Sequence, residues 1–334
     1  MTPGGTTSAP GRAAVVVVGY GSADLLARNL AATDLVAAGA FGVVVDNSAR
    51  PADREATRVV CERHGWRLVA RPDNPGFGAA VNVGARLARE LGAVALVLLN
   101  PDARLDTATL AALVDAVVAD PRTAVSPRVV TSTGRVEYAG SQWRERDGAV
   151  RGIGPRPDDH PVTLDATTPG RFDPAADGPV HGWLTGACLA VHAETFAAVG
   201  GFDERFFLYW EDLDLSHRLA HAGVRLTVRL DLTAVHDEGG THGGDHDPRA
   251  KSDLYYRWNC RNRLVFAALR LPRRTALRWV LTTPVRSREV LLRGGRRQLL
   301  RHPGAVLPVL RGSLAGVGWV LRRARTAPSW EARA

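Results

Sequence analysis

The sequence almost lacks lysine and isoleucine. Lys251 is its only lysine and Ile153 its only isoleucine, so arginine supplies nearly all of the 43 positive charges. A genome that prefers GC-rich codons produces this bias, which explains part of the arginine content. We therefore do not take arginine alone as a sign of phosphate recognition.

Cysteine and long apolar runs are also scarce. The cysteines Cys61, Cys188 and Cys260 lie far apart, are odd in number and form no CxxC pair, which argues against a disulfide framework or a zinc site. No uncharged apolar run reaches the ~18 residues of a membrane-spanning helix. The nearest, residues 303–321, contains Arg311, so we expect no spanning helix. Residues 1–12 are expected to form a flexible leader, because the apolar run after them is short and lacks a cleavage site.

The charge is divided unevenly along the chain. Residues 251–334 carry 19 basic and three acidic residues, whereas residues 1–250 carry 24 basic and 31 acidic ones. A hydrophobic share of 45% excludes a wholly disordered chain. We predict an acidic folded body with a basic helical tail that either meets an anionic membrane surface or forms a helical cap with a solvated basic face. We do not expect nucleic-acid binding, because the tail has no recognition motif.

Short apolar runs alternate with amphipathic ones over the first 120 residues. The runs AAVVVV, FGVVVDN, WRLVA and AVALVLL read as buried strands, separated by expected helices at 22–38, 53–64 and 74–91 and followed by one at 107–118. This order predicts an α/β, Rossmann-like fold with a parallel sheet. Residues 146–180 lack periodicity and are expected to form a long loop or lid. Further on we expect a helix at 211–222 and tail helices broken by Pro272, Pro284, Pro303 and Pro308.

Two motifs mark strand ends in the first half of the chain. VVVVGYGSAD carries Gly19 and Gly21, which with Asp46 form part of a dinucleotide fingerprint whose third glycine is replaced by Asp24. An NAD(P)-dependent oxidoreductase is therefore an alternative. VVVDNS places Asp46 and Asn47 at the carboxyl end of a strand, where ligands bind in open parallel sheets, although a plain turn has the same residues.

Two later motifs suit a diphosphate and its metal ion. NPGFGAAVNVGA opens a helix at Gly76 and Gly78, whose backbone N–H groups could face a diphosphate. A glycine-rich helix start that binds no ligand would have the same sequence. LVLLNPDA puts Asp102 at a strand end, where a carboxylate can hold Mg²⁺ or Mn²⁺. His236, after a later strand, could complete this site, although a histidine there is more often structural.

The most specific motif is GGFDERFFLYWEDLDLSHRLAHAG. Glu211, Asp212 and Asp214 occupy the first turn of an expected helix, directly behind a run of aromatic residues. Acidic residues stabilise helix N-termini, so helix capping is the simpler explanation. Three carboxylates beside four aromatic rings exceed what a cap requires. An apolar wall also raises the pKa of a carboxylate toward the range of a general base.

Taken together and in this order, the motifs resemble the family 2 inverting glycosyltransferases with the GT-A fold, particularly their bacterial rhamnosyltransferase-like branch. The resemblance covers about residues 13–244. It implies a GT-A domain at 13–245, with a nucleotide-sugar half at 13–120 and an acceptor and catalytic half at 121–245. A basic amphipathic helical tail at 246–334 follows. A non-catalytic, membrane-associated scaffold of the same fold is a further alternative, against which the EDLD cluster and the later histidine argue.

The resemblance also implies roles for individual residues. Asp212 would be the general base, with Glu211 and Asp214 tuning or orienting it, and Asp102 with His236 would bind the divalent metal, Mg²⁺ or Mn²⁺. The residues implied at the donor are Gly19, Tyr20, Asp46, Asn47, Asn74, Gly76, Phe77, Asn82, Asn100 and Asp102. Those implied on the acceptor side are Trp183, Thr185, Gly186 and Trp210.

The implied reaction moves a sugar, with rhamnose the first candidate, from a dTDP- or UDP-sugar to a glycan or a polyprenyl-diphosphate-linked acceptor. It would serve cell-wall or surface polysaccharide biosynthesis on the cytoplasmic face of the plasma membrane. Two departures from the family pattern affect the donor site. Asn100 replaces the first acid of the DxD metal motif, and the GYG turn replaces the commoner Tyr-Asn pair.

Overall fold

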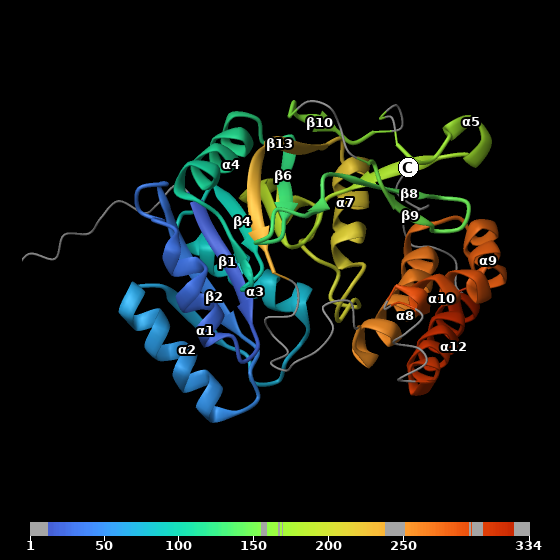
Figure 1. Ribbon diagram of the computed structural model, residues 1–334, viewed down its shortest axis with the longest axis horizontal. Helices are drawn as coiled ribbons and strands as arrows, with labels where there is room; N and C mark the ends of the chain where they lie inside the picture. The colour runs from blue at the N-terminus through green and yellow to red at the C-terminus, as the bar shows by residue number, and fades with distance from the viewer. Residues whose placement is uncertain are drawn as a thin grey trace, which may run out of the picture.

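The structure is a computed structural model that describes residues 13–154, 159–165, 168, 170–237, 251–293, 295 and 303–323. The expected leader at 1–12 lies outside the described residues. The chain forms a large mixed sheet, helices that cover it, and a group of C-terminal helices beside α7 (Glu211–His221) on the side away from the main sheet (Figure 1).

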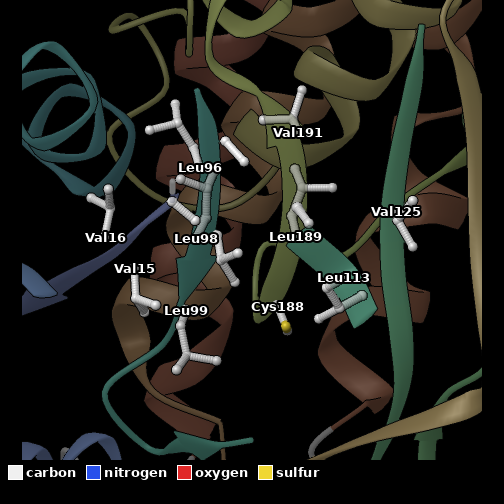
Figure 2. Packing of buried hydrophobic residues seen from close by; sticks show 14 of the residues in the cluster. Val15, Val16, Leu96, Leu98, Leu99, Leu113, Val125, Cys188, Leu189 and Val191 are labelled. Atoms are coloured by element: carbon white, nitrogen blue, oxygen red, sulfur yellow. The ribbon is translucent and has the colours of Figure 1, made fainter. Parts of the chain in front are cut away.

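The first half of the chain forms the parallel part of the sheet, as its pattern predicts. Strands β1 (Ala13–Gly19), β2 (Ala40–Asp46), β3 (Arg67–Ala70) and β4 (Ala95–Leu99) lie parallel in the order β4-β1-β2-β3. Helices α2 (Pro51–His64), α3 (Phe77–Glu90) and α4 (Thr107–Ala119) connect and cover them. Because β1 and β4 are wholly buried, their valine and leucine side chains form the core with β12 (Figure 2).

The helix predicted at 22–38 is broken in the structure. It divides into α1 (Ala23–Arg28), the short 3-10 helix η1 (Leu30–Ala32) and a turn. The buried Thr33 hydroxyl donates to the carbonyl oxygen of Leu105 at 2.7 Å, and the Asp34 carboxylate accepts from the backbone N–H of Ala37. These side-chain bonds replace the helical ones, because threonine and aspartate compete for backbone groups.

The second half completes the sheet in the order β10-β13-β6-β12-β4. The strands are β6 (Thr123–Val130), β10 (Val162–Thr163), β12 (Cys188–His192) and β13 (Arg225–His236), with short β5 (Ala103–Arg104) pairing β13 and β7 (Val136–Tyr138) pairing β6. A smaller sheet joins β11 (Val180–Trp183), β8 (Ser141–Arg144) and β9 (Val150–Gly152). The expected loop at 146–180 thus contains β9, β10 and α5 (Pro174–Asp177), which are too short to give a periodic signal. Helix α6 (Ala193–Ala198) follows β12.

The C-terminal helices share a core with the rest of the chain. They are α8 (Asp253–Arg270), α9 (Arg273–Leu281), α10 (Thr283–Leu292), η2 (Pro303–Ala305) and α12 (Val306–Arg323). Trp143, Phe206, Phe266 and Trp279 are buried together in one aromatic cluster. The break expected at Pro272 falls between α8 and α9, and Pro303 begins η2. Pro284 and Pro308 instead lie in the first turns of α10 and α12, where a missing N–H is tolerated.

Among the described residues, one helix is long and apolar enough to cross a membrane, Pro303–Arg323, where the sequence led us to expect none. It packs closely on α8. At Gly312 the two helices approach so closely that a Cβ there would lie 2.1 Å from the carbonyl oxygen of Arg257. Of the most apolar 18-residue stretch of this helix, 28% is buried inside the structure.

Candidate active site

A pocket of about 350 Å³ opens between the sheet, the N-terminus of α7 and the C-terminal helices. The sheet contributes Asn100, which follows β4, and His236, which ends β13. Helices α8 and α10 form the opposite wall. Nine residues that the sequence predicted line it: Phe77, Asn100, Trp183, Thr185, Gly186, Trp210, Glu211, Asp212 and His236.

The chain enters α7 through a strained turn. Tyr209 and Trp210 have φ angles of 67° and 75°, in the left-handed region that side chains other than glycine rarely adopt. The fully buried Asn262 of α8 donates from its amide to the carbonyl oxygens of Leu208 at 2.9 Å and Tyr209 at 2.8 Å. A residue from the C-terminal region thus holds the turn that points Asp212 into the pocket.

Two backbone donors orient the Asp212 carboxylate. Its Oδ2 accepts from the N–H of Gly186 at 3.1 Å, and its Oδ1 accepts from the N–H of Leu213 at 2.8 Å. Burial raises the pKa of Asp212 to about 6, although these two hydrogen bonds oppose the shift. A carboxylate with this pKa is ionised at neutral pH and still basic enough to accept a proton.

The neighbouring carboxylates have different environments. Glu211 lines the pocket and its Oε2 has no hydrogen-bond partner; burial first, and then the charge of Asp212, raise its pKa well above the usual range. Asp214 is fully buried away from the pocket. Its carboxylate pairs with Arg218 at 2.8 Å and with Arg270 of α8 at 2.6 Å. Asp214 therefore ties α7 to α8.

Asp102 and His236 face each other at the sheet edge. His236 Nε2 lies 3.1 Å from Asp102 Oδ1, and its Nδ1 lies 3.3 Å from Glu137 Oε2. Burial alone would lower the pKa of His236, but the hydrogen bonds and charges of Asp102 and Glu137 raise it to about 9. Within the described residues, no three His, Cys, Asp or Glu side chains form a metal cluster.

This pair nevertheless fits a divalent metal that shares its coordination with a ligand. A carboxylate oxygen and an imidazole nitrogen are suitable ligands for Mn²⁺. A bound metal would take the place of the proton on His236 Nε2, while Glu137 would hold the other ring nitrogen, as carboxylates commonly do for metal-bound histidines. Two protein ligands leave the remaining positions to phosphate oxygens and water.

Buried acceptor atoms lie at the end of β2. Asp46 and Asn47 are buried, and Asp46 Oδ2 and Asn47 Oδ1 have no hydrogen-bond partner. The other Asp46 oxygen accepts from the backbone N–H of Ser48 at 2.8 Å. Tyr20, which follows Gly19 at the end of β1, is 55% exposed beside them. Unpaired buried acceptors are costly, so this strand end is suited to a ligand that donates hydrogen bonds.

The glycine-rich entry to α3 has a packing role in the structure. A Cβ at Gly76, where φ is 97°, would lie 2.4 Å from the carbonyl oxygen of Phe207, and this oxygen accepts from the N–H of Phe77 at 3.0 Å. The helix N-terminus is therefore covered by the segment leading to α7, instead of being open to a diphosphate as expected. Asn74, with a φ of 42°, forms the turn before it.

The Asn82 amide is also occupied by this segment. It donates to the carbonyl oxygen of Phe202 at 2.9 Å and to Glu204 Oε1 at 3.1 Å, and it accepts from the N–H of Phe202 at 2.8 Å. Asn82 was expected along the donor cleft, but its side chain anchors the loop that precedes α7.

The residues expected on the acceptor side line the same pocket as Asp212. Trp183 ends β11 and accepts, through its carbonyl oxygen, the hydroxyl of the buried Tyr138 at 2.8 Å. Trp183 and Trp210 also pack against the aromatic cluster of the C-terminal helices. Thr185 precedes Gly186, whose N–H holds Asp212. The pocket around Asp212 is therefore lined partly by aromatic side chains.

Comparisons with known proteins decide the family. The family model "Glycosyl transferase family 2" matches residues 41–177. The N-acetylglucosaminyl-diphospho-decaprenol L-rhamnosyltransferase of Mycobacterium tuberculosis (strain H37Rv) is 31% identical over 309 residues, which is 86% of this chain and 96% of that protein. The chain belongs to glycosyl transferase family 2.

Two solved structures support the fold assignment of this family 2 glycosyltransferase. GalNAc-T7 with UDP, GalNAc and Mn²⁺ gives a TM-score of 0.55 at 14% identity and matches 77% of this chain, which spans 47% of that chain. The mannosyltransferase PcManGT of Pyrobaculum calidifontis, in complex with GDP-Man and Mn²⁺, gives 0.51 at 18% identity, over 95% of this chain and 87% of that one. The predicted GT-A fold and the rhamnosyltransferase-like assignment are confirmed, and the oxidoreductase alternative is wrong.

Sequence reasoning missed three groups of this glycosyltransferase's site. Glu137 lies on a strand of only three residues, too short for a periodic signal. Asn262 lies within an expected tail helix, where an isolated asparagine carries no signal except that it is unfavourable inside a helix. The arginines of the C-terminal region were attributed to codon bias and a membrane surface, although Arg263 of α8, Arg286 of α10 and Arg293 at the C-cap of α10 line the pocket.

Proposed function

We propose that this glycosyltransferase moves L-rhamnose from a nucleoside-diphosphate donor to a hydroxyl of a polyprenyl-diphosphate-linked sugar, with inversion at the anomeric carbon. The reaction would serve cell-wall or surface polysaccharide biosynthesis. The mycobacterial relative, which is aligned over nearly its whole length, supports the choice of sugar and acceptor. The proposal rests above all on Asp212, a carboxylate with a pKa of about 6 that faces a pocket lined by the residues expected around the two substrates.

Asp212 would act as the general base. The acceptor hydroxyl gives its proton to the carboxylate as its oxygen attacks the anomeric carbon, and the nucleoside diphosphate leaves from the opposite face. The N–H groups of Gly186 and Leu213 keep the carboxylate oriented toward the acceptor. We assign a proton to Glu211, the more deeply buried of the two acids, so that the pair carries one negative charge.

On the donor side, Asp102 and His236 would hold Mg²⁺ or Mn²⁺, which neutralises the charge that develops on the leaving diphosphate. Asp46 and Asn47 would receive hydrogen bonds from the nucleoside, through the unpaired acceptors Asp46 Oδ2 and Asn47 Oδ1. A uracil or thymine base offers one N–H donor and the ribose or deoxyribose offers hydroxyls. These groups can donate to the two acceptors, and we propose a UDP- or dTDP-sugar as the donor.

The C-terminal helices would bring the enzyme to the cytoplasmic face of the plasma membrane. Four leucines of α12 are about half exposed or more, namely Leu307, Leu310, Leu314 and Leu321. Their spacing puts them along one side of the helix, and Arg311 and Arg322 lie close to them in the sequence. An apolar helix face with neighbouring cations is typical of helices that lie on anionic membranes.

Thermal unfolding with UDP-, dTDP- and GDP-sugars, each with and without Mn²⁺, tests the donor site. A ligand that binds only the folded protein raises the unfolding midpoint by mass action. We expect an Mn²⁺-dependent shift with the UDP or dTDP compounds. Transfer is then tested with dTDP-rhamnose and a short-chain polyprenyl diphosphate carrying N-acetylglucosamine. No midpoint shift and no rhamnosylated product would refute the proposed function.

A further inference from the structure

One wall of the pocket is basic and is built by the C-terminal helices. Arg263 of α8, Arg286 of α10 and Arg293, which caps the end of α10, line the same pocket as Asp212. Helix α7, whose first turn carries Asp212, lies between these helices and the main sheet (Figure 1). The pocket therefore has cations on one side of the base and the Asn100 and His236 side chains of the sheet edge on the other.

Arg263 is a buried cation, and no carboxylate of the described residues is in contact with it. Its guanidinium donates to the carbonyl oxygens of Asp147 at 2.7 Å and Trp279 at 3.2 Å and to the Thr282 hydroxyl at 2.8 Å, while its Nε has no partner. Only 4% of the residue is exposed. Burial, together with the charge of Arg286, lowers the pKa of Arg263 to about 9. A bound anion beside it would offset this cost.

Arg286 and Arg293 place further donors on the wall. Arg286 pairs with Glu289 at 2.7 Å and lies 3.3 Å from Asp147, but its Nε is buried without a partner. Arg293 is exposed and donates only to the Tyr255 hydroxyl, at 3.1 Å, among the contacts of the described residues.

The carboxylates on this wall do not balance its cations. The Asp147 carboxylate is shared with Arg144, which pairs with it at 2.7 Å. Three arginines therefore line the pocket together with Glu289, and the nearby Asp147 carboxylate is already partly neutralised by a fourth arginine, Arg144. The wall keeps a positive charge, and the exposed Arg293 keeps N–H donors that a ligand can reach; this combination binds phosphate oxygens.

We propose that Arg263, Arg286 and Arg293 form a subsite for the phosphate groups of the acceptor. This inference rests on the proposed function, because it takes Asp212 as the base and the strand ends as the donor side. Inversion requires the attacking hydroxyl and the leaving diphosphate to lie on opposite sides of the anomeric carbon. An anion subsite on the far side of Asp212 from His236 therefore belongs to the acceptor and not to the donor.

The first test measures inorganic pyrophosphate binding by calorimetry, with EDTA present to suppress the metal-dependent donor site. We expect Arg293→Ala and Arg286→Gln each to weaken binding about tenfold or more, since hydrogen bonds to charged groups are among the strong ones. Arg288→Ala is the matched control, because Arg288 is an exposed arginine of α10 that does not line the pocket. Equal affinities in all four proteins would overturn the proposal.

The second test compares two acceptors that carry the same sugar, one on a short-chain polyprenyl diphosphate and one on an alkyl chain without phosphate. We expect the wild-type preference for the diphosphate acceptor, in kcat/KM, to fall about tenfold in Arg293→Ala and to persist in Arg288→Ala. An unchanged preference in Arg293→Ala would overturn the subsite. An equal loss in Arg288→Ala would also overturn it, because the effect would then arise from the tail's net charge at an anionic surface.

These outcomes separate the subsite from the proposed function. If the wild type transfers sugar but the arginine variants keep its preference, the subsite is wrong and the function stands. If the wild type transfers no sugar to either acceptor, the function is wrong, and the pyrophosphate measurement still decides whether the wall binds phosphate.

Glu289→Gln should change the affinity in the opposite direction. Because this substitution removes a carboxylate that competes for the arginines, it should tighten pyrophosphate binding.

Discussion

Replacing Asp212 with asparagine should separate catalysis from stability. Asp212→Asn keeps the size of the side chain and removes its capacity to accept a proton. General-base catalysis contributes roughly 10²- to 10⁴-fold to rate, so we expect transfer to fall by that factor. In the wild type, kcat/KM should rise with pH through about 6, because the base must be ionised.

The pKa of Asp212 also sets how the free energy of unfolding changes with pH. The pKa of Asp212 rises from 3.8 to about 6 on folding. The folded protein therefore holds this proton more tightly than the unfolded chain, and stability falls as pH rises from about 4 to about 6. Above pH 6 the ionised carboxylate costs at most about 3 kcal/mol, at 1.36 kcal/mol for each pKa unit.

Asparagine removes this cost but introduces a smaller one. Its single oxygen can accept from either Gly186 or Leu213, so one N–H loses its acceptor, at a cost of about 1–3 kcal/mol. At pH 8 we expect Asp212→Asn to be as stable as the wild type or up to about 2 kcal/mol more stable. Near pH 4, where the wild-type side chain is also neutral, the variant should be the less stable of the two.

Denaturant unfolding at pH 4 and pH 8, with transfer rates at pH 8, measures both effects. Asp214→Asn is the matched control, because it makes the same change two residues further along the helix but breaks the pairs with Arg218 and Arg270. Breaking a buried ion pair costs about 3–5 kcal/mol. Transfer by Asp212→Asn within tenfold of wild type, or a stability difference that is the same at both pH values, would refute the assignment.

Three further predictions concern the supports of the site. Asn262→Asp keeps the shape but removes the donors that hold the turn before α7, so kcat should fall at least about tenfold with little change in donor KM. Gly76→Ala should cost at least about 2 kcal/mol in unfolding free energy, from strain and from the clash with Phe207, whereas Gly134→Ala, at a positive φ with open space around it, should cost less. Glu137→Gln should raise the half-saturating Mn²⁺ concentration for transfer about tenfold, and an unchanged value would argue against a supporting role.

The parallel half of the fold follows from local patterns. Strands β1, β2 and β4 are continuous apolar runs because both faces of the sheet are covered, and turn residues mark their ends. Asp46, Asn100 and His236 each follow or end such a run, which made their position at the edge of the sheet predictable. The break after α1 was not predictable, since it depends on a hydrogen bond from Thr33 to Leu105, 72 residues away.

Within α7, spacing predicted the cluster of carboxylates but could not separate their environments. Glu211, Asp212 and Asp214 share one helical turn, and sequence alone gives each the same favourable interaction with the helix dipole. Asp214 differs because Arg270, 56 residues later, occupies its carboxylate. Asp212 differs because its oxygens meet backbone N–H groups. Both distinctions come from long-range packing, which carries no periodic signal.

The basic C-terminal region also has contacts that the sequence alone does not predict. Composition reports that residues 251–334 are rich in arginine, but it cannot say which way each side chain points. In the structure Arg270 forms an ion pair with Asp214 of α7 and Arg263 is buried at the pocket, whereas Arg288 and Arg311 are exposed. One stretch of positive charge thus places some side chains against α7 and the pocket and leaves others exposed at the surface. Since α8 also supplies Asn262 to the turn before Asp212, removing the C-terminal helices should abolish transfer even from soluble substrates, and not merely release the enzyme from membranes.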